Sequence, residues 1–310
     1  MLQSETENQF TSAGFPLASR ARFRVSGADH LRYLNGQLTQ DLKRVTSRKA
    51  LPACITSAKG RLQAEVWVLA EGDASGQTAL WVDAPRVLRE SLLERLERYI
   101  VADDVFVTDV TGELELLHFL GSNPPKCEEL LPFSRVQAAR LGDAGWDVWV
   151  PADRFEALCA SLGERLGSAE DYERLRVKRG IPAWGAELSE ETLPPEAGLD
   201  KTHVDYHKGC YIGQEVISRL KSVGHVNRVL RRFRGSQPGG SNGPSGVESN
   251  RKLSAGEALY VLGERGKPVG ALTSVVSGGA GGFYALGYLK RGVEAAHFET
   301  EGAAECVAVS

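Results

Sequence analysis

The octapeptide Lys208-Gly209-Cys210-Tyr211-Ile212-Gly213-Gln214-Glu215 places a cysteine in a setting suited to chemistry. The chain has five cysteines in 310 residues, and Cys210 stands between two glycines and close to a lysine. An amphipathic stretch, Val216-Ile217-Ser218-Arg219-Leu220, follows at once. A thiol near a helix start and a cation is expected to be reactive and accessible. Glycines nearby let a ligand approach the backbone, so we predict a functional thiol lining a pocket.

Other interpretations of Cys210 are open from the residues alone. The thiol is a small buried hydrophobic group, or a hydrolytic nucleophile with His207 or His225 as its base. His203 and His207 are spaced i, i+4, and with Cys210 they offer possible zinc ligands. Gly209 interrupts a regular helix there and no other His/Cys cluster completes a set, so we expect no metal.

Composition describes an ordinary globular protein of two or three packed units. The formal net charge is −3, so no global basic field points to nucleic acid. The stretch from Arg228 to Arg234 contains four arginines, but apolar residues are interspersed among them, which is typical of a strand with one solvent-exposed face. We expect no direct nucleic-acid partner.

The cysteines are scattered at positions 54, 127, 159, 210 and 306, with no CxxC pair. A reducing cytoplasm is the simplest setting, with no self-contained zinc or iron–sulfur site. No apolar run is long enough for a membrane span, and Met1 to Phe10 does not resemble a secretory signal. We therefore predict a cytoplasmic protein with no membrane partner.

The hydrophobic pattern predicts mixed α+β layers. Ser26 as N-cap and Asp29 at N3 predict a helix running through Tyr33 and Leu34. Further helices are expected from Pro85, from Asp153 and over 170–178. Strands are expected at 64–69, 79–82, 105–107, 114–120 and 146–150. Beyond a Gly/Ser/Pro-rich break at 235–246, strands at 259–262, 269–276, 283–289 and 306–309 predict a small antiparallel barrel.

Three segments together resemble a known family. Residues 33–42, YLNGQLTQDL, resemble the first block of the folate-binding proteins related to the glycine-cleavage T-protein. Gly180-Ile181-Pro182, followed by 191–199, ETLPPEAGL, resembles a second block. Lys208 to Glu215 matches the signature KGC[FY]xGQE of the YgfZ-like branch. The resemblance covers essentially the whole chain, in the same order.

The resemblance implies a fold and a division into domains. Interleaved ferredoxin-like α+β subdomains surround a central folate channel, and a C-terminal antiparallel β-barrel follows. The folate-binding body is expected at 1–227 and the barrel at 228–310, with a flexible loop at 235–250.

The resemblance also implies a role: a folate-binding accessory protein that supports assembly or repair of iron–sulfur clusters in client enzymes. Those clients include radical enzymes that modify tRNA. The expected cofactor is tetrahydrofolate, the clients are transient partners, and no permanent metal or cluster is expected. Cys210 is the implied functional thiol, with iron binding, sulfur binding and thiol exchange as alternatives.

Departures from the T-protein bear on its transferase activity. The T-protein has an Asp-Asp pair where this chain has Ala64 and Glu65, and a pterin-binding glutamate where it has Lys178. A lysine has three donors and no acceptor, so it cannot replace that contact. We expect no ordinary aminomethyltransferase activity. The alternatives are a tetrahydrofolate-dependent aminomethyltransferase using Glu65 or Asp83, and a folate-dependent demethylase.

The predicted site residues follow from these matches. Trp184, flanked by helix breakers, either stacks on a planar ligand or caps a core. The residues expected to bind the cofactor are Gln37, Glu65, Lys178, Trp184, Lys208 and Tyr211.

Overall fold

A computed structural model describes residues 14–17, 20–72, 78–236, 253–264, 266–279 and 281–309. The first of two compact units holds Met1–Tyr172 with Lys201–Ser218, and the second holds Glu173–Asp200 with Arg219–Ser310. The boundary expected at 227/228 stays a prediction. Residues 173–200 are grouped with the barrel strands, and the segment that carries Cys210 is grouped with the N-terminal sheets.

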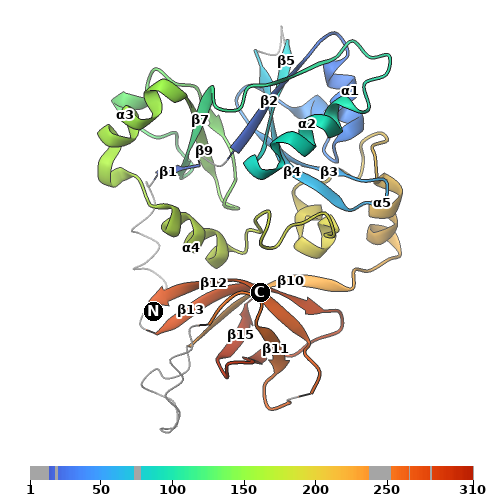
Figure 1. The fold of residues 1–310 in the computed structure, drawn as a ribbon, viewed down its shortest axis with the longest axis vertical. Coiled ribbons are helices and arrows are strands. Elements are labelled where there is room, and N and C mark those ends of the chain that lie inside the picture. The colour runs from blue at the N-terminus through green and yellow to red at the C-terminus, as the bar shows by residue number, and fades with distance from the viewer. Residues whose placement is uncertain are drawn as a thin grey trace. The chain divides into compact units, whose positions relative to one another are not determined.

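A five-stranded antiparallel sheet in the first unit has the order β3-β4-β5-β2-β6 (Figure 1). Its strands are β2 (Arg20–Ser26), β3 (Leu51–Thr56), β4 (Leu62–Glu71), β5 (Ala79–Pro85) and β6 (Phe106–Asp109). Along β4, Leu62, Ala64, Val66 and Val68 are fully buried. Side chains alternate between the two faces of a strand, so Glu65 and Trp67 lie on the other face.

Helices α1 (His30–Gln37) and α2 (Arg89–Glu97) accompany this sheet. Helix α1 contacts β5, and α2 contacts β2. Leu34, Leu92 and Leu96 are buried, as a helical apolar stripe facing a sheet requires. Tyr99 follows the end of α2 at Glu97 and is 42% exposed.

The first unit contains a second antiparallel sheet with the order β1-β7-β9-β8. Its strands are β1 (Gly14–Pro16), β7 (Leu114–Leu120), β8 (Arg135–Gln137) and β9 (Gly145–Pro151). Helix α3 (Ala152–Leu162) packs Leu158 and Leu162 against Leu117 and Val148. This apolar cluster accounts for the position of α3.

Buried charges join the two sheets of the first unit. Arg140 bonds Asp147 with Nε at 2.8 Å and Asp83 with Nη2 at 2.5 Å. Arg22 on β2 lies 4.3 Å from the Trp81 ring of β5 and 3.9 Å from the Trp149 ring of β9. A buried pair is costly to break on one side, so these contacts fix the pairing of the sheets.

The second unit contains a closed six-stranded antiparallel barrel, as predicted (Figure 1). Its strands are β10 (Arg228–Ser236), β11 (Ala258–Val261), β12 (Gly270–Gly279), β13 (Gly282–Lys290), β14 (His297–Thr300) and β15 (Glu305–Val309). Phe233, Phe283 and Phe298 fill its core. The arginine-rich stretch is strand β10, and β14 was missed because four residues carry little periodic signal.

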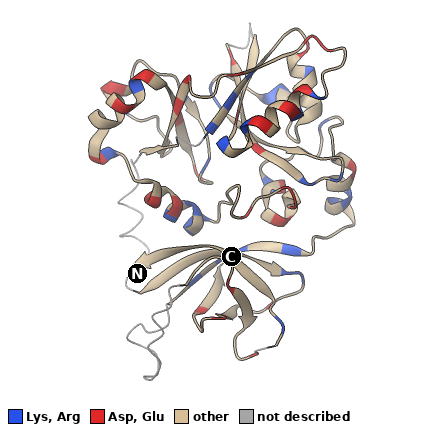
Figure 2. Ribbon diagram, viewed as in Figure 1, with Lys and Arg blue, Asp and Glu red and all other residues tan. Residues whose placement is uncertain are grey.

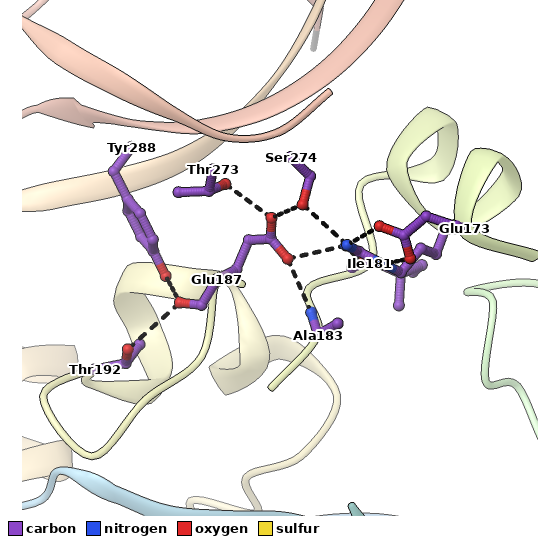
Figure 3. Close-up of polar contacts among 9 residues, drawn as sticks. Glu173, Ile181, Ala183, Glu187, Thr192, Thr273, Ser274 and Tyr288 are labelled. Atoms are coloured by element: carbon purple, nitrogen blue, oxygen red, sulfur yellow. Dashed lines mark hydrogen bonds and ion pairs between the residues drawn. The ribbon is translucent and has the colours of Figure 1, made fainter. Parts of the chain in front are cut away.

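A buried carboxylate ties the segment before residue 200 to the barrel within the second unit (Figure 3). Glu187 accepts hydrogen bonds from Ser274 Oγ at 2.6 Å and Thr273 Oγ1 at 2.8 Å on β12. It also pairs with Arg176 Nη1 at 2.9 Å, on helix α4 (Ala169–Arg179). Tyr288 Oη donates to the Glu187 carbonyl at 2.9 Å.

The helix start expected at Ser26 is wrong. Ser26 ends β2, paired with Ala79 and Phe106, and α1 begins at His30. Gly27 adopts φ +104°, a conformation that favours glycine and turns the chain between strand and helix. The Asp29 carboxylate accepts from the Asp104 N–H at 2.9 Å instead.

The predicted loop at 235–250 lies outside the described residues from 237 onward. In the described part of the chain, no helix is long and apolar enough to cross a membrane. Helices α2, α3 and α4 carry both basic and acidic residues (Figure 2).

Candidate functional site

Residues 203–213 form a loop that is hydrogen-bonded to the end of α1, to the residues just after it and to the last residue of β3, all within the first unit. Thr39 Oγ1 donates to the His203 carbonyl at 2.5 Å and accepts from the Cys54 N–H at 2.8 Å. The Asp205 N–H donates to the Thr39 carbonyl at 2.9 Å. One threonine thus joins this loop to strand β3.

Lys208 anchors the middle of the loop. Its ammonium donates to the carbonyls of Asn35 at 2.6 Å, Leu38 at 2.6 Å and Gln40 at 2.8 Å. These carbonyls lie in and just after the last turn of α1, where a cation is favourable. Burial lowers the pKa of Lys208 to about 8, although Asp41 and Asp205 favour the charged form. All three N–H donors of the ammonium are engaged with the backbone.

Gly213 and Ile212 anchor the far end of the loop. Thr56 Oγ1 donates to the Ile212 carbonyl at 2.5 Å. Gly213 has φ +88°, and a Cβ there would lie 2.5 Å from the Ser57 carbonyl oxygen. A side chain at 213 would therefore be strained and would clash with backbone.

Cys210 lies between these anchors and is exposed. Lys208 is buried on one side of it and Tyr211 on the other, with 8% and 7% exposure. The other four cysteines are buried or half-buried. The buried-hydrophobe interpretation of Cys210 is therefore wrong, while its role as a functional thiol stays a prediction. Helix α5 (Gln214–Ser222) begins four residues later.

Glu65 on β4 faces His203 of the same loop. Its Oε1 lies 3.4 Å from His203 Nε2, and His203 Nδ1 lies 2.7 Å from Thr202 Oγ1. Burial opposes ionisation of Glu65, but the His203 hydrogen bond and the charges of Arg20 and Arg140 outweigh it, lowering its pKa to about 2. Glu65 is therefore a carboxylate acceptor at neutral pH.

Asp83, the other carboxylate considered as an acid or base, has both oxygens engaged. Arg20 Nε donates to Oδ1 at 2.8 Å and Arg140 Nη2 to Oδ2 at 2.5 Å. Two guanidinium donors therefore occupy the carboxylate of Asp83. Asp83 belongs to the network that joins the sheets.

Gln37 and Tyr211 are both buried. Gln37 Oε1 accepts from Arg95 Nη1 at 2.9 Å, so α2 holds the amide in place. The Tyr211 hydroxyl has no hydrogen-bond partner among the described residues, and burial raises the pKa of Tyr211. Its ring lies 5.2 Å from Lys208 Nζ.

Lys178 and Trp184 belong to the second unit. Lys178 Nζ lies 5.7 Å from the Tyr284 ring of β13. Trp184 is half-buried and forms a bridge with Leu188. The structure therefore brings Gln37, Glu65, Lys208 and Tyr211 into one unit and Lys178 and Trp184 into the other, and their role in cofactor binding stays a prediction.

Sequence reasoning missed Thr39 and Thr56, which hold the loop, and Arg95, which binds the Gln37 amide. Thr39 lies inside the first resembling block, which is the one signal that pointed toward it. His203, considered as a zinc ligand, bonds Glu65 and Thr202 instead. No group of His, Cys, Asp and Glu suited to a metal occurs among the described residues.

Comparison with solved structures identifies the fold. The chain has the fold of a glycine cleavage system aminomethyltransferase T from Bartonella henselae, with a TM-score of 0.75. The match covers 97% of this chain and 85% of that chain at 15% identity, so it establishes the fold alone. The predicted mixed α+β fold with a C-terminal barrel is confirmed.

Comparison with curated proteins identifies relatives that are similar in sequence. The chain is 28% identical over 271 residues to proteins from Escherichia fergusonii and Shigella dysenteriae serotype 1, each named tRNA-modifying protein YgfZ. The alignment covers 81% of this chain and 77% of each relative. No family profile matches the chain. The chain is therefore similar in sequence to proteins named YgfZ, and it has the fold of a glycine cleavage T-protein.

Proposed function

We propose that this chain is a folate-binding accessory protein that supports assembly or repair of iron–sulfur clusters in client enzymes, with Cys210 as its functional thiol. The observation that carries the proposal is the exposed Cys210 on a loop held by the buried residues on either side of it. The name of its relatives supports a link to tRNA modification. The clients then include enzymes that modify tRNA, and contact with them is transient.

The glycine before Cys210 supports this role. A Cβ at Gly209 would meet no atom within 4 Å, and its φ lies outside the left-handed region, so the fold does not require glycine there. At Gly213 the fold does require it. We propose that the bare backbone at 209 lets a partner reach the sulfur closely.

Glu65, on β4, supports the proposal that tetrahydrofolate binds in the first unit. A pterin presents an N–H and amino edge, which needs an acceptor. Glu65 is ionised, positioned by His203 and 16% exposed at its side chain, so the residues present fit that edge. When bound, tetrahydrofolate supplies a reduced pterin that carries one-carbon units, and Glu65 orients it.

The decisive test is complementation of a strain that lacks its own YgfZ-type protein. Wild type should restore activity of an iron–sulfur enzyme and the dependent tRNA modification, whereas Cys210→Ala should not. Cys159→Ala is the matched control, because Cys159 is half-buried and burial raises the pKa of its thiol. Full rescue by Cys210→Ala would show that the thiol has no such role.

Gly209→Ala distinguishes a loss of protein stability from a loss of access to the Cys210 sulfur. It should leave stability within about 0.5 kcal/mol of wild type yet reduce rescue. Gly213→Ala should lose stability itself. Equal rescue by Gly209→Ala and wild type would show that a partner does not need the bare backbone at residue 209. The proposed role of the Cys210 thiol would be unaffected.

Cofactor binding is tested by titration calorimetry with tetrahydrofolate. Wild type should bind, and Glu65→Gln should weaken binding by about tenfold or more, because a charged hydrogen bond contributes roughly 1.5–3 kcal/mol. Lys178→Glu, which introduces the glutamate that the T-protein has at this position, tests whether the charge of residue 178 alters how tetrahydrofolate binds. Glu71→Gln, on the same strand, is the control, since Glu71 pairs with Arg24. No heat with wild type would end the folate proposal.

A further inference from the structure

One segment of the first unit is basic in a chain that is acidic as a whole. The chain has 40 Asp and Glu against 37 Lys and Arg, yet residues 42–64 contain six basic residues and no acidic one. The six are Lys43, Arg44, Arg48, Lys49, Lys59 and Arg61. We call this segment, residues 42–64, the basic segment.

Most of these side chains are exposed. Lys43, Arg44, Arg48, Lys49 and Lys59 all lie at the surface. Within the described chain, Lys43, Arg48, Lys49 and Lys59 form no ion pair with a carboxylate. Arg44 contacts Asp205 at 3.5 Å, with its side chain 69% exposed. The positive charge is therefore available to a partner.

The basic segment contacts the loop 203–213, called here the thiol loop, near both ends of that loop. At the first contact, Arg44 pairs with Asp205, and Lys43 is its neighbour in sequence. Gln40, two residues before the segment, accepts from Lys208 with its carbonyl. At the second contact, the turn 57–60, which carries Lys59, packs against Gly213. Cys210 comes two residues after Lys208 and three before Gly213. Lys43 and Arg44 thus lie at the contact on the Lys208 side of Cys210, and Lys59 lies at the contact on the Gly213 side.

The nearby carboxylates are engaged locally. Asp41 Oδ1 accepts from the Lys43 N–H at 3.2 Å. Asp205 accepts from the His207 N–H at 2.8 Å and pairs with Arg44. They offset part of the charge without covering Lys43 or Lys59.

We propose that the surface formed by Lys43, Arg44, Lys59 and Cys210 is the docking site for an acidic face of a partner protein. Opposite charges would steer the encounter, raise its rate and leave it brief, since exposed ion pairs contribute little to affinity. This inference rests on the proposed role of Cys210 and names the chemistry of its clients.

A protein partner fits better than RNA. The basic segment contains no aromatic residue, so it lacks the stacking platform of single-strand binding. The net charge of −3 would repel a long polyanion at a distance, whereas a local acidic patch meets only the local field.

The test compares two disulfide probes. An oligoglutamate and an oligoserine peptide each carry a cysteine activated as a 2-pyridyl disulfide. The Cys210 thiolate attacks the peptide sulfur, a mixed disulfide forms, and pyridine-2-thiol leaves. At low salt, wild type should react about tenfold faster with the glutamate probe, and roughly 0.5 M KCl should remove the difference. Rates from Cys210→Ser are subtracted to remove the other cysteines.

Charge variants locate the effect. Lys43→Gln with Lys59→Gln should abolish the preference for the glutamate probe. Lys126→Gln with Arg154→Gln removes the same charge from exposed positions elsewhere in the unit and should keep it. Equal rates for both probes with wild type, or equal loss in both double variants, would overturn the docking site.

Two further outcomes are separable. If a short RNA blocks the reaction at a lower charge concentration than an unreactive oligoglutamate, the partner is RNA and the inference is wrong. If the glutamate preference fails while Cys210→Ala still abolishes complementation, the docking surface falls and the proposed function stands.

Discussion

At the scale of residues, the structure gives Lys208 a different role from the one that the sequence suggested. Its position two residues before Cys210 suggested a cation that acts on the thiol. In the structure its three N–H donors bind the carbonyls of Asn35, Leu38 and Gln40. Lys208 therefore holds the loop and, through it, the place where the sulfur is presented.

Lys208→Met tests this role. Methionine matches the length of the side chain but leaves three carbonyls without a donor, so we expect the free energy of unfolding to fall by about 3 kcal/mol. Urea denaturation measures it, and Lys201→Met, at an exposed position, serves as the control. A Lys208→Met protein as stable as the control would show that the three bonds hold nothing.

At the scale of elements, local sequence patterns predicted helices and strands but not the contacts between distant segments. The alternation along β4 and the spacing in α4 follow from neighbouring residues, and both elements were predicted. The Ser26 cap failed because strand pairing with Ala79 and Phe106 outweighs a capping pattern. The contacts of Lys208 with residues 35–40 bridge about 170 positions, a separation that periodicity does not encode.

The buried carboxylate of Glu187 connects residues 181–188 and α4 to the barrel, so we expect its replacement to destabilise the second unit. Its side chain is fully buried and bonded to Arg176, Thr273 and Ser274. Glu187→Gln leaves the Arg176 charge without its buried partner, so we expect a loss of about 3 kcal/mol or more. Hydrogen exchange across 181–188 should rise with it.

The matched control is Glu190→Gln, at an exposed position three residues away. It should change neither the free energy of unfolding nor the exchange. If both variants behave alike, the segment is fastened by packing, and the buried carboxylate is not what holds it.

At the scale of the whole molecule, the first unit depends on buried carboxylates. The Asp147 carboxylate accepts from Arg140 and from His118, while Glu65 pairs with His203. Burial raises the pKa of Asp147, but Arg140 and His118 outweigh it, and the result is a pKa of about 2. The two sheets and the thiol loop therefore share an electrostatic dependence on pH.

Acid should destabilise the protein over a defined window. Glu65 and Asp147 have folded pKa values of about 2, below their ordinary values of 4.5 and 3.8. The unfolded chain binds more protons between these limits, so stability is present above about pH 4.5 and is lost as pH falls toward 2. Urea denaturation from pH 6 to pH 2.5 should show a loss of roughly 2 kcal/mol or more. Glu129→Gln removes a partly exposed carboxylate paired with Arg165 and should retain that slope in roughly 0.5 M KCl, where such surface pairs are screened. A flat profile would mean that these buried carboxylates gain nothing on folding.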